Sequence, residues 1–340
     1  MKYQILLLCI FANALLAADR TPPIASFDVR VIYEGGKPMV NVPVIGCFTR
    51  NGKDYNVTKA TDKRGAVHFE SVTDNAAAVI CRAKDCYDSS LDVPLDGPEN
   101  GRWKLEGPNL VLIMRRIVKP VPMWAARELE IEMPRIGKTA FDLEKRAWVA
   151  PDGNGVKPDL VFTLERKGGE EQGEATLKLT FSNQGDGVFP VPAAAPGGSD
   201  FLLPREAPAA GYLPERTWRR RWVNGETPES YRLSREIGQE VHRNLTANPP
   251  PRAYIFRVRT VLNEKGEVVS ALYGKLLGAN EFHQHRNGGE FIWDPDDHTK
   301  TAKIELTYCL NPDGTRNLEF DVKKNLFKDL DGRNMVVTPW

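Results

Sequence analysis

Residues 27–49 read FDVRVIYEGGKPMVNVPVIGCFT, and this stretch decides the fold class. Apolar residues occupy alternate positions from Phe27 to Tyr33 and again from Val40 to Val44. Alternation of this kind is typical of half-buried β-strands, and Gly35-Gly36-Lys37-Pro38 supplies residues suited to a turn. The stretch therefore predicts two strands, 27–33 and 42–49, joined by a tight connection.

The same pattern continues toward Ile117, with further strands predicted over 66–72, 77–83 and 110–117. Turn residues separate these segments at Asn51-Gly52-Lys53-Asp54 and at Asp62-Lys63-Arg64-Gly65. No helix signal interrupts them. Short strands at regular spacing favour a β-sandwich, so we predict a first sandwich domain over residues 26–118.

Two motifs in this region resemble a known group of modules. Gly36-Lys37-Pro38 leads into alternating valines, and Thr61-Asp62-Lys63-Arg64-Gly65 leads into Val67 and Phe69. These motifs resemble the carboxypeptidase-regulatory-like, or transthyretin-like, sandwiches of immunoglobulin type. The resemblance covers about the first ninety residues after the leader. It implies an accessory fold of secreted proteins without an active site of its own, and it indicates no reaction.

A second, larger β-rich domain is predicted over residues 125–340, after a proline-containing hinge at 116–123. Alternation predicts strands at 128–133, 160–166 and 175–181, and two hairpins at 254–277 and 304–320. Residues 185–211 are dense in Pro, Ala and Gly and predict an irregular loop. One amphipathic helix is predicted near 228–245, with Thr227 as its cap and Pro228 in its first turn. This domain resembles no family known to us.

The first residues and the charge balance bear on the compartment. Lys2, an apolar run over residues 5–16, and Ala17-Ala18 form the pattern of a signal peptide, predicted over residues 1–18. The protein is therefore expected to be secreted or periplasmic, with no transmembrane segment. With 46 Lys and Arg against 45 Asp and Glu, the chain lacks the basic excess of a nucleic-acid binder.

Four cysteines follow the leader: Cys47, Cys81, Cys86 and Cys309. An even number in an exported protein favours disulfides, and Cys81 with Cys86 across a short turn is the preferred pair. A Cys47–Cys81 bridge and four reduced thiols are the alternatives. Cys309 shares its predicted strand face with charged residues, which indicates exposure and pairing with a partner.

Histidines and acids gather between residues 281 and 298. His283 and His285 are two apart, so on a strand both imidazoles would face the same way, and Glu290 could add an oxygen ligand for a divalent metal. With Gly278, their order resembles the first signature of the cupins, but its glycine spacing is one residue short and no later His supplies the second signature. The alternative is a solvated polar turn.

A second cluster places Trp218, Arg220 and Trp222 within five residues. Exposed indoles beside guanidinium groups can stack on sugar rings and grip carboxylates, which indicates binding of an acidic glycan. If the segment is helical, the two indoles share a face. The alternative is that both tryptophans pack into the core.

No catalytic residues are predicted, because the sequence has no Gly-x-Ser-x-Gly elbow, His-Glu-x-x-His pair or phosphate loop. We therefore expect a mainly β protein of two sandwich domains, the second larger and carrying one helix. Its expected role is non-catalytic binding of a protein or carbohydrate partner in adhesion, assembly or glycan contact, without a cofactor. The alternative is a metal-dependent enzyme or metal-binding protein that uses His283, His285 and Glu290.

Overall fold

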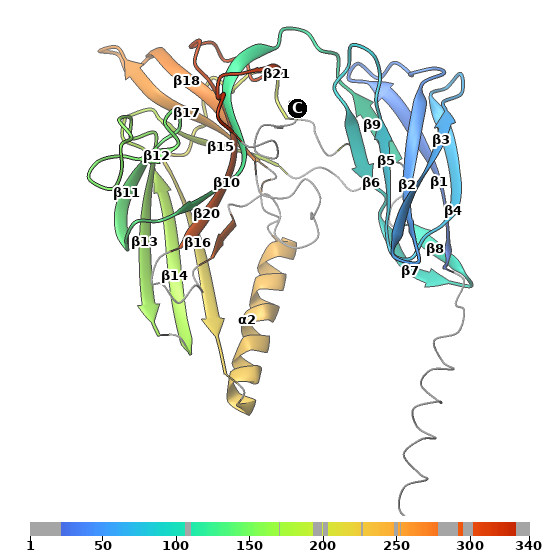
Figure 1. Cartoon of the computed structure of the whole chain (residues 1–340), viewed down its shortest axis with the longest axis horizontal. Coiled ribbons are helices and arrows are strands. Elements are labelled where there is room, and N and C mark those ends of the chain that lie inside the picture. Colours follow the sequence, from blue (N-terminus) through green and yellow to red (C-terminus); the bar gives the residue numbers. More distant parts are fainter. Residues whose placement is uncertain are drawn as a thin grey trace, which may run out of the picture. The chain divides into compact units, whose positions relative to one another are not determined.

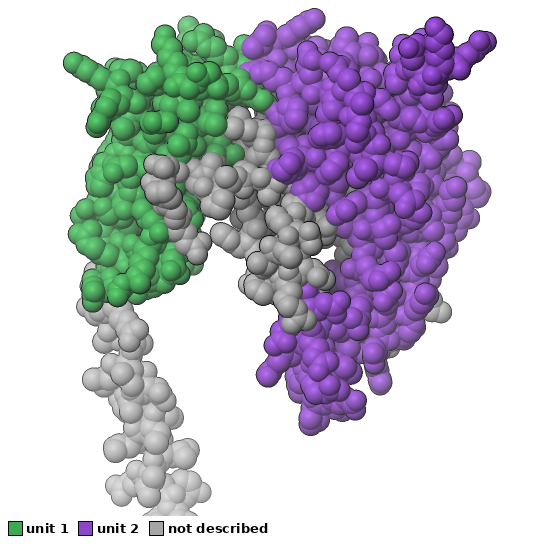
Figure 2. Space-filling model, turned by 180° about the vertical axis from the view of Figure 1, so that it is seen from behind, with its two compact units in different colours: residues 1–117, 195–201 green, residues 118–194, 202–340 purple. Residues whose placement is uncertain are grey.

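The computed structural model describes residues 22–105, 110–169, 171–192, 199, 203–225, 227–247, 251, 253–277, 292–294 and 302–330. The predicted leader, residues 1–18, lies outside them. The chain divides into two compact units, which Figure 2 colours separately. Among the described residues, unit 1 contains 22–105, 110–117 and Ser199, and unit 2 contains the rest.

Unit 1 is a β-sandwich of two sheets (Figure 1). Within its described residues, one sheet has five strands in the order β4-β1-β8-β7, with β9 pairing β1 in parallel, and the other has four in the order β3-β2-β5-β6. The strands are β1 (Ile24–Tyr33), β2 (Pro43–Arg50), β3 (Lys53–Ala60), β4 (Ala66–Val72), β5 (Ala77–Cys81), β6 (Ser89–Asp92), β7 (Leu95–Glu99), β8 (Arg102–Leu105) and β9 (Leu110–Met114).

The core of unit 1 lies between these sheets and contains the alternating apolar residues of the opening stretch. Phe27, Val29 and Val31 of β1 face Val44 and Phe48 of β2 in one buried cluster. The strands predicted from the sequence are present, and β3, β6, β7 and β8 are additions. There is room for β3 because the turn after β2 uses only Asn51 and Gly52. The mainly β sandwich architecture is confirmed.

One side of this sandwich is bordered by the edge strands β3 and β4. Side chains of β3 reach across to β4: the Lys59 ammonium donates to the carbonyl oxygen of His68 at 2.9 Å, and the Tyr55 hydroxyl donates to that of Val72. The Lys59 ammonium also lies over the Phe69 ring, 5.7 Å from its centroid. Two backbone acceptors on the outer side of β4, those of His68 and Val72, are therefore already occupied by side chains of the facing sheet.

Unit 2 is a second, larger pair of sheets. In its described residues one sheet has seven strands in the order β15-β17-β18-β20-β10-β21, with β19 on β20, and the other has five in the order β12-β11-β13-β14-β16. The strands are β10 (Val121–Glu132), β11 (Gly137–Asp142), β12 (Ala147–Trp148), β13 (Leu160–Gly168), β14 (Gln172–Thr180), β15 (Gly187–Val191), β16 (Glu215–Val223), β17 (Ala253–Leu262), β18 (Val268–Leu277), β19 (Ile292–Asp294), β20 (Lys303–Asn311) and β21 (Phe320–Asn325).

The two sheets of unit 2 enclose one large apolar cluster, in which Phe141 and Phe162 meet Phe256 and Tyr308. The predicted helix is present as α2 (Pro228–Ala247), and the Ser230 N–H donates to the Thr227 hydroxyl at 3.1 Å, as an N-cap requires. In the described part of the chain, no helix has the length and apolar character of a membrane span.

Three expectations for unit 2 are wrong. The loop predicted over 185–211 contains strand β15, which pairs with β17. The strand after the Asn311 turn, β21, pairs in parallel with β10 and not with β20. Cys309 is fully buried, because it packs with Met123, Ala125 and Phe320 in a small apolar cluster of its own.

Candidate binding site

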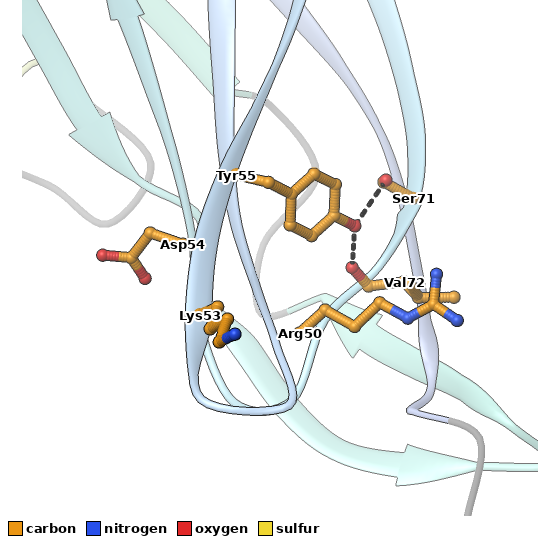
Figure 3. A pocket seen from close by; sticks show the side chains of 6 residues that line it. All are labelled: Arg50, Lys53, Asp54, Tyr55, Ser71 and Val72. Atoms are coloured by element: carbon orange, nitrogen blue, oxygen red, sulfur yellow. Dashed lines mark hydrogen bonds between the residues drawn. The ribbon is translucent and has the colours of Figure 1, made fainter.

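An open hollow of about 400 Å³ lies at the side of unit 1 where β3 faces β4 (Figure 3). We call it the Tyr55 hollow, and its lining residues are Arg50, Lys53, Asp54, Tyr55, Ser71 and Val72. Arg50 is the last residue of β2. Lys53, Asp54 and Tyr55 begin β3, and Ser71 and Val72 end β4. The hollow is thus formed where the hairpin of one sheet meets the edge strand of the other.

The β2–β3 hairpin sets the two cations of the hollow side by side. Asn51 and Gly52, at φ 52° and 69°, make a two-residue turn with both central residues in the left-handed region, the geometry that Asn-Gly favours. The turn therefore pairs Arg50 directly with Lys53. Directly opposed residues of an antiparallel pair project on the same face. Both side chains consequently point to the core-facing side of the sheet, beyond the last buried residue, Phe48.

Tyr55 forms the floor of the hollow. Its half-buried ring stacks on Phe48 with the ring centroids 5.7 Å apart. Its hydroxyl donates to the carbonyl oxygen of Val72, so the contact with the Ser71 hydroxyl at 2.8 Å uses the serine as donor. The lone pairs of Ser71 Oγ remain as acceptors at the wall. The floor is therefore aromatic and fixed, with a hydroxyl oxygen beside it.

The acids near the hollow leave its cations available. Asp54 belongs to the opposite face of β3, its side chain points away from Arg50 in Figure 3, and it accepts from the Thr49 hydroxyl at 3.0 Å. Asp74 accepts from the Gly52 N–H at 2.9 Å and holds the hairpin tip. Among the described residues, neither Arg50 nor Lys53 makes an ion pair. Two exposed cations thus stand together without an ion-pair partner among the described residues.

Unit 2 holds a different concentration of charge, which we call the Arg259 network. Its members are Arg259 and the acids Asp142, Glu144 and Asp159. The Arg259 guanidinium donates to both oxygens of Asp159 at 2.8 and 2.9 Å and to Glu144 at 2.6 Å. The two aspartate side chains are each 1 % exposed. Arg259 lies on β17, in the seven-stranded sheet. Asp142 ends β11 of the five-stranded sheet, Glu144 follows that strand, and Asp159 directly precedes β13. The network therefore links the two sheets of unit 2.

Local backbone geometry positions Arg259. The register of β17 against β18 shifts after Val258, and Arg259 takes φ 56°, in the left-handed region. The carboxylate of Asp186 stabilises this irregularity by accepting from the N–H groups of Arg259 and Thr260 at 3.1 and 2.8 Å. The bulge thereby directs a long cationic side chain from one sheet to the acids of the other.

The acids of this network are engaged in structural bonds. Asp142 accepts four backbone N–H bonds at 2.8–3.0 Å, from Glu144, Lys145, Val156 and Lys157. Burial acts to raise the pKa of the Asp142 carboxyl, but these four bonds outweigh it and hold the pKa below its usual value. Burial raises the pKa of Asp159 despite the opposing effect of Arg259. This arrangement stabilises loops and pairs sheets.

Replacing Asp142 with asparagine tests that role. The amide nitrogen would face two backbone donors, so we expect unit 2 to lose about 2–4 kcal/mol of unfolding free energy at neutral pH. Because the folded pKa lies below the unfolded value of about 3.9, the charged form stabilises the fold above that value and the contribution is lost as pH falls through the folded pKa. The difference between wild type and variant in urea unfolding should therefore shrink on acidification. A gap that stays constant with pH would contradict this explanation.

The structure corrects the binding prediction for Trp218, Arg220 and Trp222. These residues lie on strand β16, and the two indoles are only 4 % and 6 % exposed. Both belong to the main core of unit 2, and the guanidinium of Arg166 lies over the Trp222 ring. Alternate strand residues face the same sheet surface, and here that surface is the core side, so the indoles cannot stack on a sugar. Arg220 is exposed between them.

The predicted metal ligands His283, His285 and Glu290 lie outside the described residues, so the metal site stays a prediction. In the part of the chain that the structure does describe, no group of three or more His, Cys, Asp or Glu side chains could hold a metal ion.

The structure does not contain the predicted disulfide between Cys81 and Cys86, because both residues are present as thiols. Both side chains belong to the core of unit 1, where they pack as small apolar groups. Burial, with the nearby Cys86 thiol, raises the pKa of Cys81 to about 11. Its thiol donates to the carbonyl oxygen of Pro43 at 3.6 Å. A protonated, buried thiol of this kind is unreactive.

The Tyr55 hollow was not predicted from the sequence. A signal was present, since Arg50-Asn51-Gly52-Lys53 is a two-residue hairpin turn flanked by two cations. Treating Asn51 to Asp54 as one turn hid the pairing of Arg50 with Lys53. The contribution of Ser71 and Val72 could not be read from the sequence, because it depends on how the two sheets face each other.

Comparisons with known proteins give little support for a relationship. No protein-family model matches the chain, and no curated protein matches it. Among solved structures, the chain is similar to 3-chlorocatechol 1,2-dioxygenase from Rhodococcus opacus 1CP, at 10 % identity and a TM-score of 0.24. The similar part covers 29 % of this chain and 62 % of the dioxygenase chain, so it spans less than two thirds of that protein.

Proposed function

We propose that this protein is an exported, secreted or periplasmic binding protein without catalytic activity of its own, and that unit 1 contacts an anionic ligand through the Tyr55 hollow. The observation that carries the proposal is the pairing of Arg50 with Lys53 across the hairpin turn without an acidic partner. The leader-like first residues and the likeness of the unit 1 motifs to accessory sandwich modules of secreted proteins support the same proposal.

Electrostatics favours an anion at this position. Like charges directly opposite one another on neighbouring strands are destabilising, and many cross-strand charge pairs in proteins are of opposite sign. The cost of holding Arg50 beside Lys53 is offset when a ligand carboxylate, sulfate or phosphate lies between them. The guanidinium fork of Arg50 matches the geometry of such a group with two parallel N–H donors.

The hollow is also prepared for binding before a ligand arrives. The hairpin tip is fixed by the bond from Gly52 N–H to Asp74 and by the Asp74 N–H donating to the carbonyl oxygen of Thr49 at 2.7 Å. The Tyr55 floor is fixed by its stacking on Phe48 and its bonds to β4. A site whose walls do not need to be ordered loses less entropy when a ligand binds.

The Arg259 network of unit 2 supports a non-catalytic role. The carboxylates of Asp142 and Asp159 accept backbone N–H groups or the guanidinium of Arg259, and both are almost fully buried. Carboxylates held in this way connect sheets and loops. Unit 2 is accordingly proposed as a scaffold and unit 1 as the contact module.

A charge-removal experiment on the complete protein tests this function. The double variant Arg50→Gln, Lys53→Gln should bind an anionic polymer at least about tenfold more weakly than wild type. Wild-type binding should weaken as ionic strength rises. The matched control is Lys63→Gln with Lys84→Gln, which removes the same charge from exposed positions of unit 1 outside the hollow. Equal loss in both double variants, or no anion binding by wild type, would refute the proposal.

A further inference from the structure

We propose that the ligand of the Tyr55 hollow is an acidic glycan, a chain of carboxylated sugars whose carboxylate lies between Arg50 and Lys53. This inference rests on the proposed function and narrows it to one chemical class. The features that decide between classes are the groups that surround the two cations, because the cations alone would accept any anion.

The walls offer acceptors to a ligand that carries hydroxyl groups. The Ser71 hydroxyl donates its proton to Tyr55, so its remaining lone pairs can only accept. A sugar ring brings several O–H donors together with its carboxylate. A glutamate side chain or a terminal carboxylate brings the anion without them, so the combination of groups matches a uronic acid better.

The aromatic floor and the open shape of the Tyr55 hollow also suit an acidic glycan. Tyr55 presents an aromatic ring that is half-buried and held by Phe48 and β4. Aromatic rings cover the apolar C–H surfaces of sugars while charged neighbours grip their acids. The hollow is open to solvent, so it can hold one unit of a longer chain. An enclosed cavity would instead select a free monosaccharide.

The experiment compares matched probes on the complete protein. Oligomers of galacturonate, mannuronate and glucuronate are titrated beside their methyl esters, which keep the ring hydroxyls and lose the charge, and beside a glutamate-rich peptide of similar length and charge. We expect at least one uronate oligomer to bind at least about tenfold more tightly than its methyl ester and than the peptide. The Arg50→Gln, Lys53→Gln variant should lose this binding, while Lys63→Gln, Lys84→Gln should keep it.

A second substitution separates glycan recognition from charge alone. Ser71→Ala removes an acceptor of the wall without changing any charge, and it should weaken uronate binding several-fold and leave peptide binding unchanged. If the peptide binds as tightly as every uronate oligomer, the ligand class is wrong and the anion-binding function stands. If no anionic probe binds, both the ligand class and the proposed function are refuted.

Discussion

Replacing Arg259 with alanine is expected to lower the unfolding free energy of unit 2 by about 3–5 kcal/mol, because removing one partner of a buried ion pair leaves the other charges uncompensated. The Arg259 guanidinium donates two hydrogen bonds to Asp159 and a third to Glu144. The Asp159 side chain is 1 % exposed, so its carboxylate would lose these bonds in a buried position. Urea unfolding followed by tryptophan fluorescence measures the loss, since Trp218 and Trp222 lie in the same core.

Two variants control this experiment. Arg219→Ala removes a guanidinium that is 67 % exposed and lies 3.4 Å from Glu174, and surface pairs of this kind contribute about 1 kcal/mol or less. Arg259→Lys keeps the charge and the unusual backbone angle but loses the fork that serves two acids, so its loss should be intermediate. If Arg259→Ala loses no more than Arg219→Ala, the network does not hold the sheets of unit 2 together.

Gly274→Ala is expected to destabilise unit 2 by about 3 kcal/mol or more, because the added methyl group has no space. A Cβ at this position would lie 2.1 Å from the Phe256 ring and 2.2 Å from the carbonyl oxygen of Cys309. Phe256 is the direct partner of Gly274 on β17, and Cys309 belongs to β20 on the other side. The Phe256 ring could rotate away from the added methyl group. The Cys309 carbonyl is part of the backbone pairing between β18 and β20, so it cannot move without breaking that pairing.

Gly238→Ala is the matched control in the helix. No atom lies within 4 Å of the position that a Cβ would take there, so alanine should stabilise α2 by about 1 kcal/mol through its higher helix propensity. The double variant Gly274→Ala, Phe256→Leu should recover part of the loss in thermal unfolding, since only the contact with the ring is relieved. A Gly274→Ala protein as stable as wild type would show that the two strands can separate at this point.

The strands and the helix could be predicted from local pattern because their causes are local. Alternation places Phe27, Val29 and Val31 on one side of a strand wherever the strand ends up. The helix begins at Pro228 because the Thr227 hydroxyl satisfies a free N–H of the first turn, which needs only neighbours in sequence. Both features were therefore readable before any tertiary contact was known.

The segment around Trp218 shows where local pattern fails. Residues four apart share a side both on a helix and on a strand, so the spacing of Trp218 and Trp222 does not distinguish the two. Whether the shared side faces solvent or core depends on β14 and on the opposite sheet. The same limit applies to the Tyr55 hollow: the pairing of Arg50 with Lys53 was readable from the hairpin turn, and the approach of Ser71 was not.

Arg259 is the clearest case of a feature without a local signal. Its partners Asp159 and Glu144 are separated from it by 100 and 115 positions in the sequence. Its placement depends on a bulge held by Asp186, itself 73 positions away. Only the packing of one sheet on the other brings these residues together, so composition and spacing could not reveal the network.

The side chains that cross from β3 to β4 bear on how this protein behaves at high concentration. A strand at the edge of a sheet has unpaired backbone N–H and C=O groups. An extended segment of another chain can pair with these groups, so exposed edge strands promote aggregation. Lys59 and Tyr55 occupy two acceptors of β4 that an incoming chain would need, so adding a strand to β4 requires breaking these native bonds first. These side-chain bonds therefore disfavour edge-to-edge association at β4.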